Sequence, residues 1–411
     1  MTAASGEEGH EMKNSKKALL RGAVGLVIML VLGAIYAWSY FKVALEAEYP
    51  AWSQTQLTLN FTILMSFFCL GGLLAGSGMK RISKTVQIII AGLMMGAGFL
   101  GASLLPERET AARIQLYLCY GVCSGLGTGI AYNAVLSGVQ PWFPRATGRI
   151  SGVLLMGMGF GSLILGNVAA KLMEVYTLAA TFRIFAAGSA LLLLAGAAVI
   201  RLPRPGEVKT EAAQSAGPTE EQRSYTTGEM LRRPTFWLYF IWNVIFSAGG
   251  LLVINSAASI SMYYGLAAVI GLLVAVFNGL GRLGLGSCMD VMGWKKTMYL
   301  NNGIILLAGA VLLAGDRLGS GGLALTGMLL MGLCYGGGIT ISAALIRKLY
   351  GSRHYAGNFS VSNLCIIPAS VFGPMLAAAL QDGSGGYRST FVMVLAMGCV
   401  ALGLNVFIRK P

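Results

Sequence analysis

Twelve apolar runs of about 20 residues follow one another along this 411-residue chain, and they limit its fold more than any other feature. At a rise of about 1.5 Å per residue, a helix of this length spans the hydrocarbon core of a bilayer. Only 11% of the residues are charged, whereas a soluble chain needs about a quarter. We therefore predict an all-α, polytopic membrane protein with transmembrane helices at about 18–41, 55–78, 84–105, 113–138, 149–172, 179–200, 235–262, 266–288, 296–315, 321–345, 357–381 and 388–408.

The longest polar segment, 201–234, divides the runs into two sets of six. Its prolines, among Glu, Gln, Ser and Lys, are typical of a flexible linker. Near its end, Thr226 and Glu229 have capping-box spacing and Pro234 follows, which predicts a short surface helix. We predict two pseudo-symmetric six-helix halves, with boundaries at 1–17 (tail), 18–200 (first half), 201–234 (linker), 235–408 (second half) and 409–411 (tail).

The net charge of +14 is distributed unevenly along the chain. If the first residue faces the cytoplasm, 22 of the 30 Lys and Arg residues fall in cytoplasmic segments and seven in segments on the opposite side. This asymmetry follows the positive-inside rule, so we predict that both termini are cytoplasmic and that the chain lies in a plasma membrane, as in the inner membrane of a bacterium. We interpret the excess of basic residues as a topology signal and expect no nucleic-acid partner. A polar, lysine-bearing tail precedes the first helix, so we expect no cleavable signal sequence.

Arg282 is the one basic residue inside an otherwise apolar membrane run, Leu266–Cys288, which only Asn278 also interrupts. A charge at that depth is costly, so such residues usually face a cavity on a substrate or ion path. None of the sixteen acids is predicted to lie at mid-membrane depth, so the natural counterion is a substrate anion. The planar guanidinium suits a carboxylate. The alternative is a structural arginine bonded to backbone carbonyls.

Other polar side chains within the runs are candidates for the same site. Asn278 lies one helical turn before Arg282 and shares its face, so it could orient the guanidinium or bind the substrate. A tyrosine adds an apolar wall and one hydroxyl, which suits a small polar ligand. We predict a substrate site that contains Arg282, Asn278, Tyr36, Tyr120, Tyr132, Tyr335 and Asn363, although packing alone would also explain each of the uncharged members.

The sequence has few residues that could support catalysis or bind a metal. The chain has seven cysteines and two histidines, and none of them has metal-ligand spacing. We interpret the cysteines as small packing residues. Two histidines outside the membrane runs cannot complete a catalytic set. We therefore expect no enzymatic activity, no metal and no cofactor.

The segment after the eighth run resembles the cytoplasmic-loop signature of the major facilitator superfamily, Gly-x-x-x-Asp-x-x-Gly-x-Lys/Arg. The residues that carry this resemblance are Gly286, Asp290, Gly293, Lys295 and Lys296. In that superfamily the acid contacts a neighbouring helix end and basic groups, so the resemblance implies a role in gating. The matching place after the second run has Lys80 where the acid belongs. A basic topology determinant is the alternative interpretation.

Three further segments are similar to the oxalate/formate antiporter family: GAIYAWS at 33–39, WFPRATG at 142–148 and GEMLRRPTFW at 228–237. That family belongs to the major facilitator superfamily and is related to the monocarboxylate transporters. The resemblance implies that Arg282 matches the substrate arginine, and that Tyr36, Tyr132, Tyr335 and Asn363 match cavity positions. Oxalate carriers have a second cation on the eleventh helix, where this chain has Ile366. One cation beside an apolar wall fits a monoanion better than a dianion.

The resemblance therefore implies a monomeric secondary transporter of short monocarboxylates such as lactate or pyruvate, working by alternating access with a proton as the second partner. In the monocarboxylate transporters an acid lies one turn before the arginine, and here that position is Asn278. The residue that would hold the proton is therefore open. Two alternatives also remain: exchange of oxalate-like dianions for monoanions, and a transporter-like sensor that binds without transport.

Overall fold

The computed structural model describes residues 2–79, 81–143, 147–204, 207, 224–267, 270–271, 273–351, 353–384 and 386–409, and its regular elements there are all helices. Lys80 and residues 144–146 of the predicted motifs lie outside these ranges. The first eight α-helices are α1 (Thr2–Leu32), α2 (Trp38–Glu48), α3 (Gln54–Leu73), α4 (Lys84–Ala102), α5 (Glu109–Leu116), α6 (Gly125–Val139), α7 (Thr147–Val175) and α8 (Leu178–Ala197). The others are α9 (Thr227–Leu231), α10 (Pro234–Tyr263), α11 (Leu273–Val291), α12 (Gly293–Leu318), α13 (Gly321–Tyr350), α14 (Tyr355–Asn363), α15 (Ile366–Ser384) and α16 (Arg388–Phe407).

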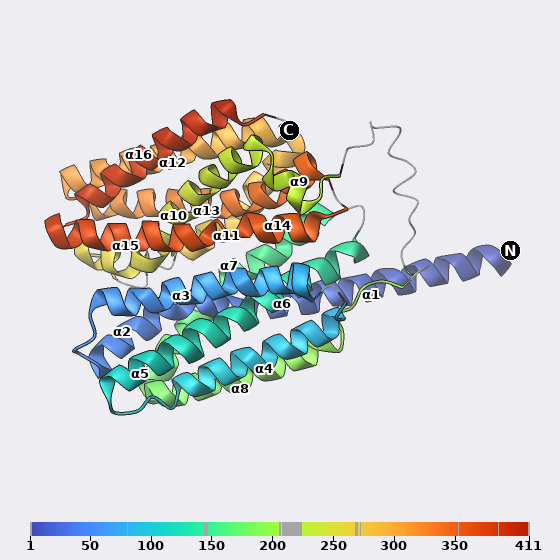
Figure 1. The fold of residues 1–411 in the computed structure, drawn as a ribbon, viewed down its shortest axis with the longest axis horizontal. Coiled ribbons are helices and arrows are strands. Elements are labelled where there is room, and N and C mark those ends of the chain that lie inside the picture. The colour runs from blue at the N-terminus through green and yellow to red at the C-terminus, as the bar shows by residue number, and fades with distance from the viewer. Residues whose placement is uncertain are drawn as a thin grey trace.

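The helices form two bundles that lie side by side, α1–α8 and α9–α16 (Figure 1). In the first bundle α1 packs on α6 and α7, α3 on α6, and α4 on α6 and α8. The same pairings recur in the second bundle, where α10 packs on α13 and α15, α11 on α13, and α12 on α13 and α16. This repetition is the pseudo-symmetry expected of two related halves. The start of α1 and the end of α16 lie at the same end of the bundles, which we term the terminal end (Figure 1).

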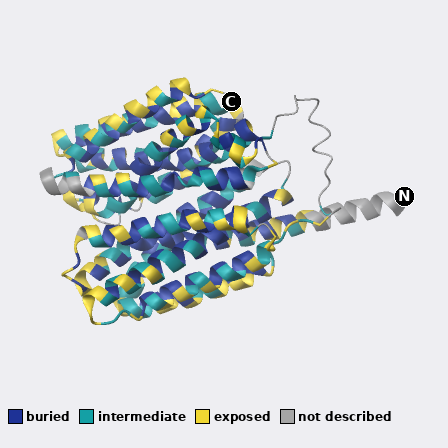
Figure 2. Cartoon of the chain, viewed as in Figure 1, coloured by how far each residue is buried: buried dark blue, intermediate teal, exposed yellow. Residues whose placement is uncertain are grey.

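The described helices have the length and composition of membrane spans. Eleven are long and apolar enough to cross a bilayer, and the apolar part of α11, Leu273–Met289, is a shorter one. Large apolar side chains such as Leu191 and Val400 are exposed on the outer helix surfaces, at 69% and 55%. Figure 2 shows buried residues concentrated along the inner faces. Since extended apolar surfaces are rare on soluble monomers, these faces are suited to lipid. The predicted all-α polytopic fold is confirmed.

The predicted start of the eighth span at residue 266 is wrong, because a helix stop precedes it. Gly265 has a φ of 73° and follows the last turn of α10. The backbone nitrogen of Leu266 donates to the Ser261 carbonyl at 2.9 Å, and that of Gly265 donates to Met262 at 3.0 Å. These two bonds form a Schellman motif, which ends a helix at a left-handed glycine. α10 therefore ends before residue 266, and α11 begins at Leu273.

The predicted span at 357–381 is present as Gly357–Ala377, with a break in it between α14 and α15. Pro368 has no N–H to donate to the Leu364 carbonyl, and its ring crowds that carbonyl. The Leu364 carbonyl instead accepts a bond from Ile367 at 3.0 Å. The break places Cys365 and Ile366 beside the centre of the molecule. A 3₁₀ segment, Gly33–Ala37, interrupts the first span at a similar depth.

Side-chain hydrogen bonds are present at both ends of the linker. At its start, Glu207 accepts hydrogen bonds from Arg201 (2.7 and 2.8 Å) and Lys17 (3.2 Å), and the Arg201 guanidinium holds the pKa of Glu207 well below its usual range. At its end, the predicted capping box is present: Thr226 N donates to Glu229 Oε2 (2.8 Å), and Glu229 N donates to Thr226 Oγ1 (3.3 Å). This box begins the short helix α9, which confirms that prediction.

Candidate functional site

The two bundles meet along two seams, α7 against α11 and α3 against α15. A central cavity of about 20 Å³ lies between these seams. That volume holds about one water molecule, so the cavity is closed around a very small space. Its walls come from both bundles, and they consist of Tyr36, Phe68, Tyr132, Met158, Asn243, Ser247, Arg282, Tyr335, Ile339, Ser342, Asn363, Cys365 and Ile366.

Arg282 lies in this wall and is 1% exposed. Its Nε donates to Asn278 Oδ1 at 3.3 Å, one turn earlier on α11. Its Nη1 donates to the backbone carbonyl of Leu155 on α7, across the seam. Gly281 lets α11 approach α13 closely, because a side chain there would meet the Leu333 carbonyl. Close backbone contact thus fixes the helix that carries the guanidinium.

No carboxylate pairs with Arg282 among the described residues. Among these residues Glu207 forms ion pairs with Lys17 and with Arg201, and neither pair involves Arg282. The Leu155 bond matches the alternative of an arginine held by a backbone carbonyl, but it uses only one of five N–H donors. The second terminal nitrogen makes no hydrogen bond to the described part of the chain. The guanidinium therefore has donors left for an anion in the cavity.

The structure brings most of the predicted site together. Tyr36, Tyr132, Tyr335 and Asn363 line the same cavity as Arg282, and Asn278 reaches it through its hydrogen bond to the guanidinium. Ile366, where oxalate carriers are expected to have a cation, forms part of the wall. The cavity thus combines one cation with aromatic and aliphatic surfaces.

Tyr120 lies elsewhere and does not line this cavity. It is buried in an aromatic cluster of the first bundle, with ring centroids 5.2 Å from Trp38, 6.1 Å from Phe41 and 5.4 Å from Phe99. Its hydroxyl makes no hydrogen bond among the described residues. Tyr120 therefore packs the interior of one bundle, and a substrate between the bundles would not contact it in this conformation.

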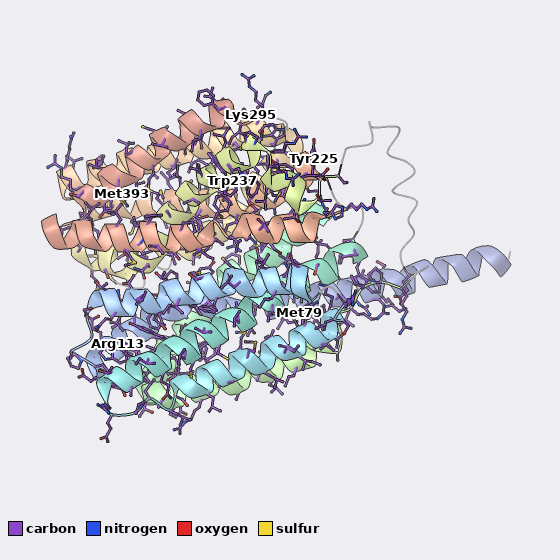
Figure 3. The ribbon with its side chains drawn as sticks, in the orientation of Figure 1. Met79, Arg113, Tyr225, Trp237, Lys295 and Met393 are labelled. Carbon is purple, nitrogen blue, oxygen red and sulfur yellow. The ribbon has the colours of Figure 1, made fainter. Side chains whose placement is uncertain are left out.

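The loop motif lies at the terminal end, where Figure 3 labels Lys295. Lys295 Nζ donates to the carbonyls of Asn405 and Ile408 (2.6 Å to the latter), so this cation caps the C-terminal end of α16. Gly293, with a φ of 80°, allows the tight turn between α11 and α12. Gly286 lies within α11 and Lys296 is exposed, while the side chain of Asp290 lies outside the described part of the structure.

A second cavity, of about 370 Å³, lies toward the end opposite the terminal end. It is framed by α2 along its length, by the last turns of α7 and α10 and by the start of α11. The lining residues are Tyr36, Ser39, Tyr40, Val43, Ala44, Ala47, Ala170, Met173, Ile254, Ala257, Ala258, Met262, Gly271, Val274, Ala275 and Asn278. We term this second cavity the outer cavity. Tyr36 lines both cavities, so its ring lies between the outer cavity and the space around Arg282.

Sequence reasoning missed several cavity residues, above all Asn243, Ser247, Ser342 and Cys365. A signal was available for the first two, because Asn243 and Ser247 are four residues apart on α10 and form a polar stripe in an apolar span. Cys365 reaches the cavity because the helix breaks just before Pro368. An interpretation of this segment as one continuous span does not predict that position.

Two pseudo-symmetric helical bundles around a buried central cation are typical of polytopic membrane transport proteins. Residues 25–366 match the family model of the Major Facilitator Superfamily, so the chain belongs to that family. It is 26% identical to the oxalate:formate antiporter of Oxalobacter formigenes over 93% of this chain and 89% of that protein. It is 24% identical to apicoplast pyruvate carrier 1 of Toxoplasma gondii, over 91% and 81% of the two chains.

The solved structure of the proton:xylose symporter XylE bound to a bromodeoxyglucose has the same fold, with a TM-score of 0.73. The match covers 97% of both chains at 16% identity, and it shows the fold alone. The resemblance to oxalate/formate and monocarboxylate carriers drawn from the sequence is confirmed, since the relatives include both kinds.

Proposed function

We propose that this protein is a carrier of short monocarboxylates, such as lactate or pyruvate, whose carboxylate binds Arg282. One observation carries the proposal: a buried guanidinium lies between the two bundles without a carboxylate partner among the described residues. An arginine–carboxylate pair gains strength in a site that excludes water. A carrier anion would supply the missing charge. The transporter relatives support a carrier rather than an enzyme.

The walls of the cavity support a monoanion. Ile366 and Met158 give it an apolar side, and no Lys or second Arg lines it within the described residues. A dianion would leave one charge without a partner in a desolvated space, which is costly. The antiporter relative keeps exchange with oxalate-like dianions as the alternative, but Ile366 argues against it.

Alternating access would open the space around Arg282 first to one end of the molecule and then to the other. In this conformation the wider cavity opens away from the terminal end, and Arg282 bonds the Leu155 carbonyl across the α7–α11 seam. A substrate carboxylate would compete with that carbonyl for the guanidinium. Binding would then weaken a contact between the bundles and allow them to rock. We place the terminal end in the cytoplasm, on the distribution of Lys and Arg.

We further propose proton symport. The described lining of the central cavity has no Asp, Glu, His or Lys, so the proton would travel with the substrate or through water. Movement of one proton with one monoanion is electrically neutral. Uptake should therefore respond to a pH gradient and ignore the membrane potential.

The experiment is uptake of labelled L-lactate into proteoliposomes under an imposed pH gradient. Arg282→Gln should reduce uptake to the level of protein-free liposomes, whereas Arg317→Gln, at an exposed arginine, should transport like the wild type. Saturable lactate uptake by Arg282→Gln would overturn the assignment. Uptake that occurs only with formate or oxalate loaded inside the liposomes would favour the antiporter.

A further inference from the structure

A polar stripe along α10 has no role in the proposed carboxylate site. Tyr239, Asn243 and Ser247 are spaced four residues apart, so they share one face of the helix. They are 0%, 3% and 2% exposed. Burial of polar groups in an apolar span is unfavourable unless hydrogen bonds satisfy them. The partners of this stripe therefore indicate its role.

Hydrogen bonds fix the carboxamide of Asn243. Its Nδ2 donates to Ser342 Oγ on α13 at 3.2 Å and to Cys365 Sγ at the α14–α15 break at 3.0 Å. The Tyr239 hydroxyl holds this arrangement, because it contacts Ser342 and bonds Ser362 Oγ at 2.9 Å. Both amide hydrogens are thus engaged. The carbonyl oxygen Oδ1 accepts no hydrogen bond from the residues that the structure describes.

Asn243 lies in the wall of the same cavity as Arg282, on a different helix. The cavity therefore offers a cation for a carboxylate and an acceptor for a hydrogen-bond donor. A 2-hydroxymonocarboxylate carries both groups on adjacent carbons. A 2-oxo acid offers only a second acceptor, and an unsubstituted acid offers nothing. Both would leave the Asn243 oxygen without a partner in a desolvated site, which is unfavourable.

We propose that Asn243 is a specificity-determining residue that selects 2-hydroxymonocarboxylates over their 2-oxo and unsubstituted counterparts. The inference rests on the proposed function, because it requires the carboxylate on Arg282. A site that offers a hydrogen bond to a substrate hydroxyl discriminates strongly against analogues without one. We expect a preference of roughly tenfold or more, since one buried hydrogen bond has about that effect on affinity.

The test measures how well L-lactate, pyruvate and propionate compete with labelled L-lactate uptake in proteoliposomes. The wild type should bind lactate about tenfold more tightly than the other two acids. Asn243→Leu should bring the three affinities together while it keeps the affinity for propionate. Asn255→Leu is the matched control, because Asn255 lies three turns further along α10 and lines neither cavity, and it should keep the preference.

Equal affinities in the wild type, or a preference that persists in Asn243→Leu, would overturn the inference. If all three acids are transported equally and the transport requires Arg282, only the selectivity fails. If none is transported, the proposed function fails. Should Asn243→Leu not fold, Cys365→Ala removes one acceptor and lets the carboxamide rotate. That variant must then lower the preference, and an unchanged preference would equally overturn the inference.

Discussion

The two seams between the bundles are closed in different ways. Across the α3 seam, Thr62 donates to the Ser370 carbonyl at 3.2 Å and Cys69 to the Asn363 carbonyl at 3.3 Å. Nearby, Asn133 on α6 donates to Ser360 on α14 at 3.0 Å. The α7–α11 seam instead has glycine-containing faces and the bond from Arg282, and the outer cavity lies beside it.

The two seams therefore differ in how a ligand can affect them. Neutral hydrogen bonds between side chains and backbone hold the α3 seam, so its strength does not depend on a ligand. The α7–α11 seam is bridged by a guanidinium, which an anion can take over. The substrate therefore acts on one seam directly and on the other only through movement of the bundles. Four substitutions or cross-links test this difference between the seams.

A cross-link between α6 and α14, next to the α3 seam, should have the largest effect. In a variant without the seven native cysteines, Asn133→Cys and Ser360→Cys place two thiols at positions whose side chains are in contact. Oxidation should lower lactate uptake to background, because alternating access requires this seam to open, and reduction should restore it. Transport that continues with the disulfide formed would show that the seam does not have to part.

A second cation should change the preferred charge of the substrate. Ile366→Lys adds an ammonium to the wall that already contains Arg282. The ratio of oxalate to lactate affinity should rise by roughly tenfold or more, since a hydrogen bond to a charged group contributes about 1.5–3 kcal/mol. Competition uptake measures the ratio, and Ile366→Met is the neutral control. An unchanged ratio would contradict the argument from charge.

Removal of the ring between the two cavities should have a moderate effect. Tyr36→Ala joins the outer cavity to the space around Arg282. A thiol reagent should then modify Cys365, which is 1% exposed, several times faster in a protein with Cys365 as its single cysteine. Tyr40→Ala, which enlarges only the outer cavity, serves as the control. Equal labelling rates in the two variants would place the barrier elsewhere.

Loss of one seam hydrogen bond should have the smallest effect. Thr62→Val removes the bond to the Ser370 carbonyl. A single bond contributes about 1 kcal/mol, so the population in which this part of the α3 seam is closed should fall about fivefold relative to the population in which it is open. Distances between spin labels on the two bundles would report the shift. Thr58→Val, one turn earlier on α3, is the control. A shift of equal size in this control would refute the role of the bond.

The sequence predicted those features that depend on composition and short spacing. Arg282 stands out because a charge in an apolar run is costly, and Asn278 is recognised from its position one turn earlier. The capping box of α9 follows from Thr226 and Glu229. Such local patterns require no knowledge of how distant helices pack.

Features that depend on packing between helices could not be predicted in this way. Tyr120 and Tyr132 are both tyrosines in one apolar run, yet only Tyr132 lines the cavity. The ring of Tyr120 packs instead in an aromatic cluster inside the first bundle. Cys365 reaches the centre because Pro368 breaks the helix, and its bond to Asn243 joins segments 122 positions apart. Only the folded arrangement brings these groups together.

Binding to the purified protein tests most directly whether Arg282 holds the substrate carboxylate. Titration of L-lactate by calorimetry should give saturable binding to the wild type and to Arg317→Gln, and no detectable binding to Arg282→Gln. Arg282→Lys should bind more weakly than the wild type, because a lysine keeps the charge and loses the planar fork of donors. Wild-type affinity for lactate in Arg282→Gln would contradict the claim that this guanidinium binds the carboxylate.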